Sequence, residues 1–334
     1  MSWGNSLLLS AGFDNDWDKV KSFLKKGANI HAKTEHGANL LMYACYHGRL
    51  DMVEYLLTGK DLKKHANIHD VNDDGMDALM WACHYSENLD IIRYLLTSKE
   101  LTEHANILNT DKSGYNALTH ACANTRTDII HYLLTSNELT QKADISYCVK
   151  GLNSLMISCR YGNLEFVKYF LASKDFKKHF TIHSKDEMGY SAIIHAAING
   201  YSDIVKYLLT SDELIEKANI NDTDNNAYTI LMHASENEYF ELLNYLMFSS
   251  EIKERANLYH VNNNNQTILT LAFSLYQHNV VKDLIFGLDY QLDKQTLDIL
   301  CDDETLLEML NQRELYEKMN VSLPRKEKIK SRKI

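Results

Sequence analysis

The sequence predicts an all-α solenoid, a stack of short helix pairs, and three observations lead to this prediction. A second apolar segment with three- and four-residue spacing follows each apolar core, as in LDIIRYLL (89–96). The steps between the first residues of successive cores are 33, 38, 39, 37, 38, 38 and 38. The cores themselves end in a small residue and are LLLSA (7–11), LLMYA (40–44), ALMWA (78–82), ALTHA (117–121), SLMIS (154–158), AIIHA (192–196), ILMHA (230–234) and ILTLA (268–272). A period of this length is typical of stacked repeats that share one core.

Eight units result, at residues 1–33, 34–71, 72–110, 111–147, 148–185, 186–223, 224–261 and 262–287. Each is predicted to hold two helices, the first short and ending near a glycine such as Gly48, Gly162 or Gly200. A strong N-cap former precedes every core: Ser6, Asn39, Asp77, Asn116, Asn153, Ser191, Thr229 and Thr267. The turn before the cap needs a positive φ, and its residues are Gly37, Gly75, Gly114, Gly151, Gly189, Ala227 and Asn265.

With these residues in place, residues 1–287 resemble the ankyrin repeat family. The family pattern is roughly D-x-x-G-x-T-P-L-H-x-A-A-x-x-G-x-x-x-[IV]-V-x-x-L-L, followed by G-A-[DN]-[IV]. Unit one closes with KKGANI, and the family's Thr-Pro pair is missing throughout, since the only proline is Pro324. Unit two, GANLLMYACYHGRLDMVEYLL, matches at Gly37, Leu41, Ala44, Gly48, Val53, Leu56 and Leu57.

Most units are five residues longer than the family's usual repeat, and the extra residues form the phrase seen in YLLTSKELTEHANI (94–107). We expect an added helical turn, started by a Ser or Gly and docked by an apolar side chain. The alternative is that the inserted residues form a second binding surface, a binding ledge beside the helices. The apolar residues at this place are Leu62, Leu101, Leu139, Phe176, Leu214 and Ile252.

Residues 288–320 are predicted to form two helices that cap the stack, and residues 321–334 a basic, disordered tail. The formal net charge is −10, and the last ten residues carry six Lys/Arg and one Glu, which leaves −15 for residues 1–324. Such a body disfavours nucleic acid and suits a protein with a basic or mixed surface. The tail is read as a solubilising segment, with a localisation or acidic-partner signal as the alternative.

The sequence predicts a cytoplasmic monomer. No apolar run is long enough to span a membrane, and no basic residues precede the short apolar run at the N-terminus. The six cysteines contain no CxxC pair, which fits a reduced compartment. Delivery into another cell by a route without a signal stays open.

The sequence offers no catalytic or metal motif, and we expect no enzyme activity, no cofactor and no metal. HExxH, GxSxG, GxGxxG and P-loop patterns are missing. Cys45, Cys83, Cys122 and Cys159 share one register, which places them one repeat apart, too far for a disulfide or a shared zinc, so they are read as core. The histidines also recur at the repeat spacing, which indicates a structural register position and not a set of metal ligands. An enzyme with an unrecognised site in residues 288–334 is the remaining alternative.

The resemblance implies non-catalytic binding of a protein partner through the turn tips and the exposed side of each first helix, on the concave face. The alternative is that the chain is a microbial or viral effector, inhibitor or immunity protein, which binds and blocks a foreign protein. By register, the expected partner-binding residues are Trp3, His36, Tyr46, His47, Asp74, Met76, His84, Tyr85, Tyr115, Asn124, Leu152, Arg160, Tyr161, Met188, Tyr190, Asn199 and Tyr228. The same slots also hold Phe13, Asp73, Glu236 and Asn237.

Overall fold

The computed structural model describes residues 3–173, 176, 181–252 and 256–287. Within these residues, sixteen α-helices form eight consecutive pairs and a single π-helical turn, η1 (Asp283–Gly287), ends the last pair. The first helices of the pairs are α1 (Trp3–Phe13), α3 (Leu40–Tyr46), α5 (Ala78–Tyr85), α7 (Ala117–Ala123), α9 (Ser154–Arg160), α11 (Ala192–Ile198), α13 (Ile230–Glu236) and α15 (Ile268–Ser274). The second helices are α2 (Trp17–Lys25), α4 (Leu50–Thr58), α6 (Leu89–Thr97), α8 (Thr127–Thr135), α10 (Leu164–Ala172), α12 (Ser202–Thr210), α14 (Phe240–Phe248) and α16 (His278–Lys282).

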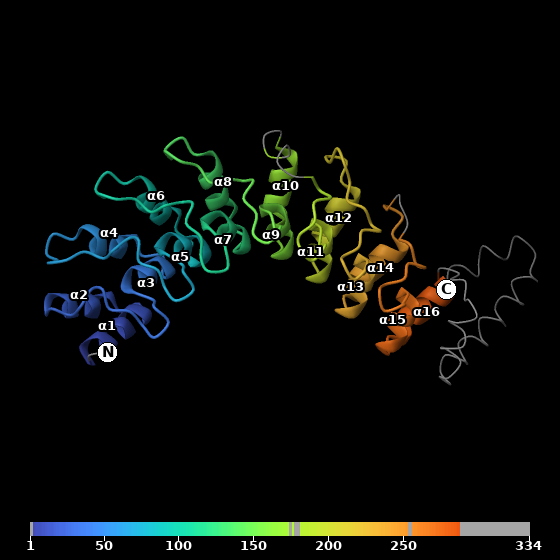
Figure 1. Ribbon diagram of the computed structural model, residues 1–334, viewed down its shortest axis with the longest axis horizontal. Helices are drawn as coiled ribbons and strands as arrows, with labels where there is room; N and C mark the ends of the chain where they lie inside the picture. The colour runs from blue at the N-terminus through green and yellow to red at the C-terminus, as the bar shows by residue number, and fades with distance from the viewer. Residues whose placement is uncertain (1–2, 174–175, 177–180, 253–255, 288–334) are drawn as a thin grey trace, which may run out of the picture.

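The pairs follow one another along an arc, with the odd-numbered helices on its inner side and the even-numbered helices on its outer side (Figure 1). Each first helix contacts its own partner and the first helices of the neighbouring units, as α3 does with α1, α4 and α5. The described residues contain only isolated β-bridges and no strand. The predicted all-α solenoid is therefore confirmed. The expected capping segment 288–320 and tail 321–334 lie outside the described residues.

Most of the predicted N-caps form. The side chain of Asn39 accepts the Met42 backbone N–H at 3.0 Å, and Asp77 accepts that of Met80 at 2.9 Å. Asn116, Asn153, Thr229 and Thr267 make the equivalent bond. Two predicted caps are wrong.

Ser6 lies inside α1, which already includes Trp3. Ser191 sits at the cap position but its Oγ is buried without a partner.

The turn before each cap has the positive φ that the sequence predicts. Gly37 has φ 76°, while Ala227 and Asn265 both have φ 59°. The left-handed region is free for glycine but costs an alanine about 1–2 kcal/mol. Ala227 is therefore a strained position in the stack.

The core runs through the whole stack between the two helices of each pair. In α6, Ile91, Ile92 and Leu95 are fully buried. The four cysteines that share one register, Cys45, Cys83, Cys122 and Cys159, are also fully buried and unpaired, which confirms them as core residues. Burial raises the pKa of the Cys122 thiol to about 12.

The inserted residues form a single hydrogen-bonded turn, so the predicted extra helical turn is wrong. The Leu101 backbone N–H donates to the Ser98 carbonyl at 3.3 Å, and Ser98 has the extended ψ of 126°. This extended residue turns the chain away from the axis of α6, and the helix cannot continue.

The two other features predicted for the insertion are confirmed. Ser98 Oγ accepts the Glu100 N–H at 3.2 Å and so starts the turn. Leu139 and Ile252 are buried, and the corresponding side chains of the other units pack on the core.

Candidate functional site

The turn tips of neighbouring units are tied together by one backbone hydrogen bond at each of several junctions. The Asp73 N–H donates to the His36 carbonyl at 3.0 Å, and the Lys112 N–H donates to the Asp74 carbonyl at 2.8 Å. The same bond recurs later, from Asn225 to Met188 at 3.1 Å. Backbone bonds therefore link the tips in two runs, from unit two to unit four and from unit five to unit eight.

In units two, three, four, six, seven and eight, a side-chain oxygen organises the tip from within. Oδ1 of Asp111 accepts the N–H of Ser113 at 2.9 Å and the N–H of Tyr115 at 2.8 Å. Short polar side chains commonly hold turns in this way. The residues that play the same part in other units are Thr34, Asn72, Asp186, Asp224 and Asn262.

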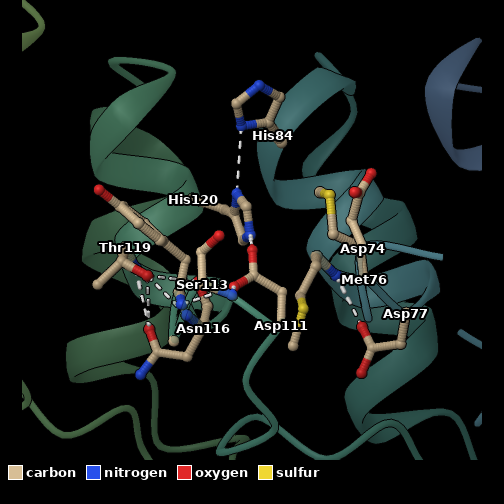
Figure 2. Close-up of polar contacts among 12 residues, drawn as sticks. Asp74, Met76, Asp77, His84, Asp111, Ser113, Asn116, Thr119 and His120 are labelled. Carbon is tan, nitrogen blue, oxygen red and sulfur yellow. Dashed lines mark hydrogen bonds and ion pairs between the residues drawn. The ribbon is translucent and has the colours of Figure 1, made fainter. Parts of the chain in front are cut away.

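In three units the second carboxylate oxygen of this aspartate binds a histidine of the first helix. His120 Nε2 lies 3.0 Å from Oδ2 of Asp111, and Figure 2 shows the imidazole between this carboxylate and His84. The two Nδ1 atoms of His120 and His84 are 3.3 Å apart. Burial is the main cause that lowers the pKa of His120 to about 4, so the ring is neutral at pH 7 and donates Nε2–H to the carboxylate.

These Asp–His pairs resemble part of a catalytic dyad, but their atoms are already engaged. Asp111 Oδ1 holds the tip backbone, Oδ2 holds the imidazole, and both side chains are at most 9% exposed. The pair thus ties the tip to the first helix.

A hollow on the inner side lies across units one to three and has a volume of about 700 Å³. We call it the aromatic pocket. Five rings line it, together with the carboxylates of Glu35 and Asp74: Phe13, Tyr43, Tyr46, Trp81 and Tyr85. The ring centroids of Tyr46 and Tyr85 are 5.3 Å apart, and those of Trp81 and Tyr85 are 5.2 Å apart. The rings come from α1, α3 and α5, so the wall of the aromatic pocket crosses three units.

The predicted partner-binding residues differ in exposure. The exposed ones are His36, Tyr46, Asp74, Tyr85, Arg160, Tyr161, Met188 and Asn199, with Phe13, Asp73, Glu236 and Asn237 exposed as well. The half-buried ones are His47, His84, Tyr115, Asn124, Tyr190 and Tyr228. The side chain of Trp3 lies outside the described part of the chain.

Met76 and Leu152 do not fit the expected exposed surface, because each is only 8% exposed. Both follow the glycine of the tip, where the side chain turns toward the helices. The tyrosines at the same position, Tyr115, Tyr190 and Tyr228, are half-buried. We therefore remove Leu152 from the candidate binding residues and keep Met76 only as a lining residue of the aromatic pocket.

Several half-buried residues have packing roles. His47 Nε2–H donates to the Phe13 carbonyl at 2.8 Å and so joins units one and two. The rings of Tyr115 and Tyr228 lie against His120 and His233, with centroid distances of 5.8 Å and 5.2 Å. These residues shape the inner side as much as they expose surface.

The structure gathers the exposed predicted residues into two groups. His36, Tyr46, Asp74 and Tyr85 meet in the aromatic pocket. Farther along, the Arg160 guanidinium lies 5.9 Å from the centre of the Tyr161 ring. Met188 and Asn199 stand in later units and belong to neither group.

Two pocket residues, Tyr43 and Trp81, were missed in the sequence. They occupy the fourth place of the apolar core, where units four, six and seven have His120, His195 and His233. The sequence did contain a signal for them. The fourth core position is Tyr or Trp in units two and three but His in unit four, and such a change between adjacent units indicates a local change of the surface.

Within the described part, no group of three or more His, Cys, Asp or Glu residues is placed to hold a metal ion. No described helix combines the length and the apolar character needed to cross a bilayer.

A family model described as "Ankyrin repeats (3 copies)" matches residues 7–103, 59–145, 98–181, 137–213 and 155–257. The overlapping matches together span residues 7–257 and follow the helix pairs described above. A comparison with curated proteins gave no match.

Proposed function

The chain belongs to the ankyrin repeat family, and from this premise we propose that it is a non-catalytic module that binds a protein partner through the inner side of its arc. The observation that carries the proposal is a set of large exposed side chains on the first helices and the tips. Tyr46 and Tyr85 are 42% exposed, Tyr161 is 40% exposed and Met188 is 54% exposed. Aromatic and methionine side chains are enriched in protein interfaces.

The rigidity of this side supports the same function. The tips are linked by backbone hydrogen bonds, and buried Asp–His pairs fasten three of them to α7, α11 and α13. A surface that is already ordered pays little conformational entropy when a partner binds. The free energy of the contacts with the partner then does not have to offset the ordering of this surface and contributes to affinity.

Charge suggests the nature of the partner. The net charge of −10 favours a protein with a basic or mixed surface, whose approach would be accelerated at low ionic strength. The buried and engaged state of the Asp–His pairs supports a function without catalysis.

Affinity capture with the full chain tests this proposal. A triple variant, Tyr85→Ala, Tyr115→Ala and Tyr161→Ala, should lose the captured partner. A matched triple on the outer side, Ile215→Ala, Phe240→Ala and Phe248→Ala, removes exposed apolar side chains and should keep it. Thermal melting followed by circular dichroism shows whether both variants are folded. Equal capture by both triples would exclude the inner side as the binding surface.

A further inference from the structure

We propose that the aromatic pocket receives one cationic side chain, a lysine or an arginine, of a bound polypeptide segment. This inference rests on the proposed function, and it adds the place on the inner side and the chemistry of the residue that enters it.

The rings provide the first argument. Tyr43 and Trp81 meet edge to face with centroids 6.2 Å apart, and Tyr46 lies 6.4 Å from Trp81 at an angle of 65°. The rings are thus inclined to one another and present several π faces and edges toward one hollow. A cation within about 6 Å of such a face is attracted by the ring quadrupole, most strongly by tryptophan.

The charges of the lining provide the second argument. Glu35 and Asp74 stand on the tips of units two and three, both are exposed, and both line the pocket. The lining contains no lysine or arginine. A guest with a positive charge therefore meets two carboxylates and no like charge, whereas an acidic guest is repelled.

Several tyrosines of the second helices differ from those of the pocket. On the second helices, a cation of the chain covers a neighbouring tyrosine, as with Lys206 over Tyr245 at 4.9 Å and Lys21 over Tyr55 at 5.2 Å. Among the described residues, no such contact covers Tyr46, Trp81 or Tyr85. These rings are free to receive a cation from outside the chain.

A second hollow fixes the direction of the guest. It shares Tyr46 and Tyr85 with the aromatic pocket but is lined on its far side by His47, His84 and Arg126. Its charged lining residues are Arg126 and Glu87, one of each sign, whereas the aromatic pocket has Glu35 and Asp74 and no Lys or Arg, so a cationic side chain prefers the side of Glu35 and Asp74. A segment that crosses the two tyrosines would therefore direct its lysine or arginine toward the tips.

The size of the pocket agrees with this guest. A volume of about 700 Å³ exceeds what one side chain needs and leaves room for the adjoining backbone of a segment. The openness of the hollow toward the inner side of the arc suits a chain that passes across it.

The test uses the full chain and a random-sequence peptide display library as the probe. We expect the enriched peptides to share one lysine or arginine. Replacing that residue by its uncharged isostere, norleucine for lysine or citrulline for arginine, should weaken binding by about tenfold. Tyr85→Ala should weaken binding by a similar factor.

The double variant Glu35→Gln with Asp74→Asn keeps the shape of the pocket and removes both charges. It should weaken binding about threefold to tenfold at low salt and less at high salt. Phe248→Ala changes an exposed aromatic residue of α14 on the outer side and should leave peptide affinity unchanged. Tyr161→Ala changes an inner-side tyrosine outside the pocket and should weaken binding less than Tyr85→Ala does.

Three results would overturn the inference. Enriched peptides without a shared cation, or full affinity after the isosteric replacement, would exclude the proposed chemistry. Loss of binding with Tyr161→Ala but not with Tyr85→Ala would exclude the pocket while the inner-side function stands. A partner captured through the inner side, with no peptide enriched, would also leave the function intact and reject the pocket.

Discussion

The Nε2 atom of His195 lies 2.9 Å from Oδ2 of Asp186, nine residues earlier in the chain. The same pairing occurs between His120 and Asp111 at 3.0 Å and between His233 and Asp224 at 3.1 Å. In unit three, Trp81 replaces the histidine and Asn72 replaces the aspartate. The two positions change together because the carboxylate has a partner only where the imidazole is present.

We expect these pairs to make the stack sensitive to acid. Burial is the main cause that lowers the pKa of all three histidines, to about 4 for His120. Between the unfolded pKa of about 6.5 and the lower folded pKa, the unfolded chain binds more protons than the folded chain. Stability is therefore complete above about pH 6.5 and falls as the pH decreases, on the order of 1 kcal/mol per pH unit for each histidine. Urea denaturation at pH 7.5, 6.5 and 5.5 measures this loss.

A pair of variants separates this effect from general acid unfolding. His120→Asn should be less stable than the parent at pH 7.5, because it leaves Asp111 without its imidazole, but should lose less stability on acidification. His31→Asn changes an exposed histidine and should keep the parent's pH dependence. Identical slopes for the parent and His120→Asn would contradict the assignment.

Thiol reactivity should divide the described cysteines into two classes. Cys148 is exposed, whereas Cys45, Cys83, Cys122 and Cys159 are fully buried. Desolvation is the main cause that raises the pKa of all five thiols, but only the last four are shielded from a reagent. The thiolate is the reactive form, so the buried four should resist alkylation in the folded state. Mass-spectrometric mapping after brief iodoacetamide treatment should find Cys148 modified first. Early modification of Cys83 would show that the core opens more readily than this packing allows.

Much of the fold could be predicted because each unit repeats the same local signals. Asn39 and Asp77 cap their helices as expected, and Gly37 has the predicted positive φ. The insertion was misread because the sequence around Leu101 suits a helical turn as well as a β-turn. Both kinds of turn can begin at an extended serine whose Oγ caps the turn, as Ser98 does, so this stretch does not encode which of them forms.

The candidate site was predicted less completely than the fold. Register alone placed Tyr46 and Tyr85 on the inner side, where both are exposed. It failed for Met76 because burial after the tip glycine depends on the length and direction of the side chain. It also missed Trp81, whose slot is filled elsewhere by a histidine that turns toward an aspartate.

The inserted turns are expected to stabilise the stack through their docked apolar side chains. Leu139→Ala removes a side chain that is 8% exposed and should lower the free energy of unfolding by about 2–3 kcal/mol. Ile215→Ala in another inserted turn removes a side chain that is 82% exposed and should change it by less than about 0.5 kcal/mol. Urea denaturation measures both. If Leu139→Ala kept full stability but lost the captured partner, the insertions would act as a binding ledge instead.

Ala227 is the position where we expect one substitution to increase stability. Its φ of 59° lies in the left-handed region, where an alanine costs about 1–2 kcal/mol and glycine costs little. Ala227→Gly relieves this strain but gives the unfolded chain more freedom, worth about 0.4–1 kcal/mol. The net gain should be about 0.5–1 kcal/mol, visible as a higher urea midpoint. Ala197→Gly makes the same chemical change inside α11, where it should cost about 1 kcal/mol. Opposite signs for the two variants would confirm that backbone strain at the tip of unit seven is the cause, whereas destabilisation by both would contradict it.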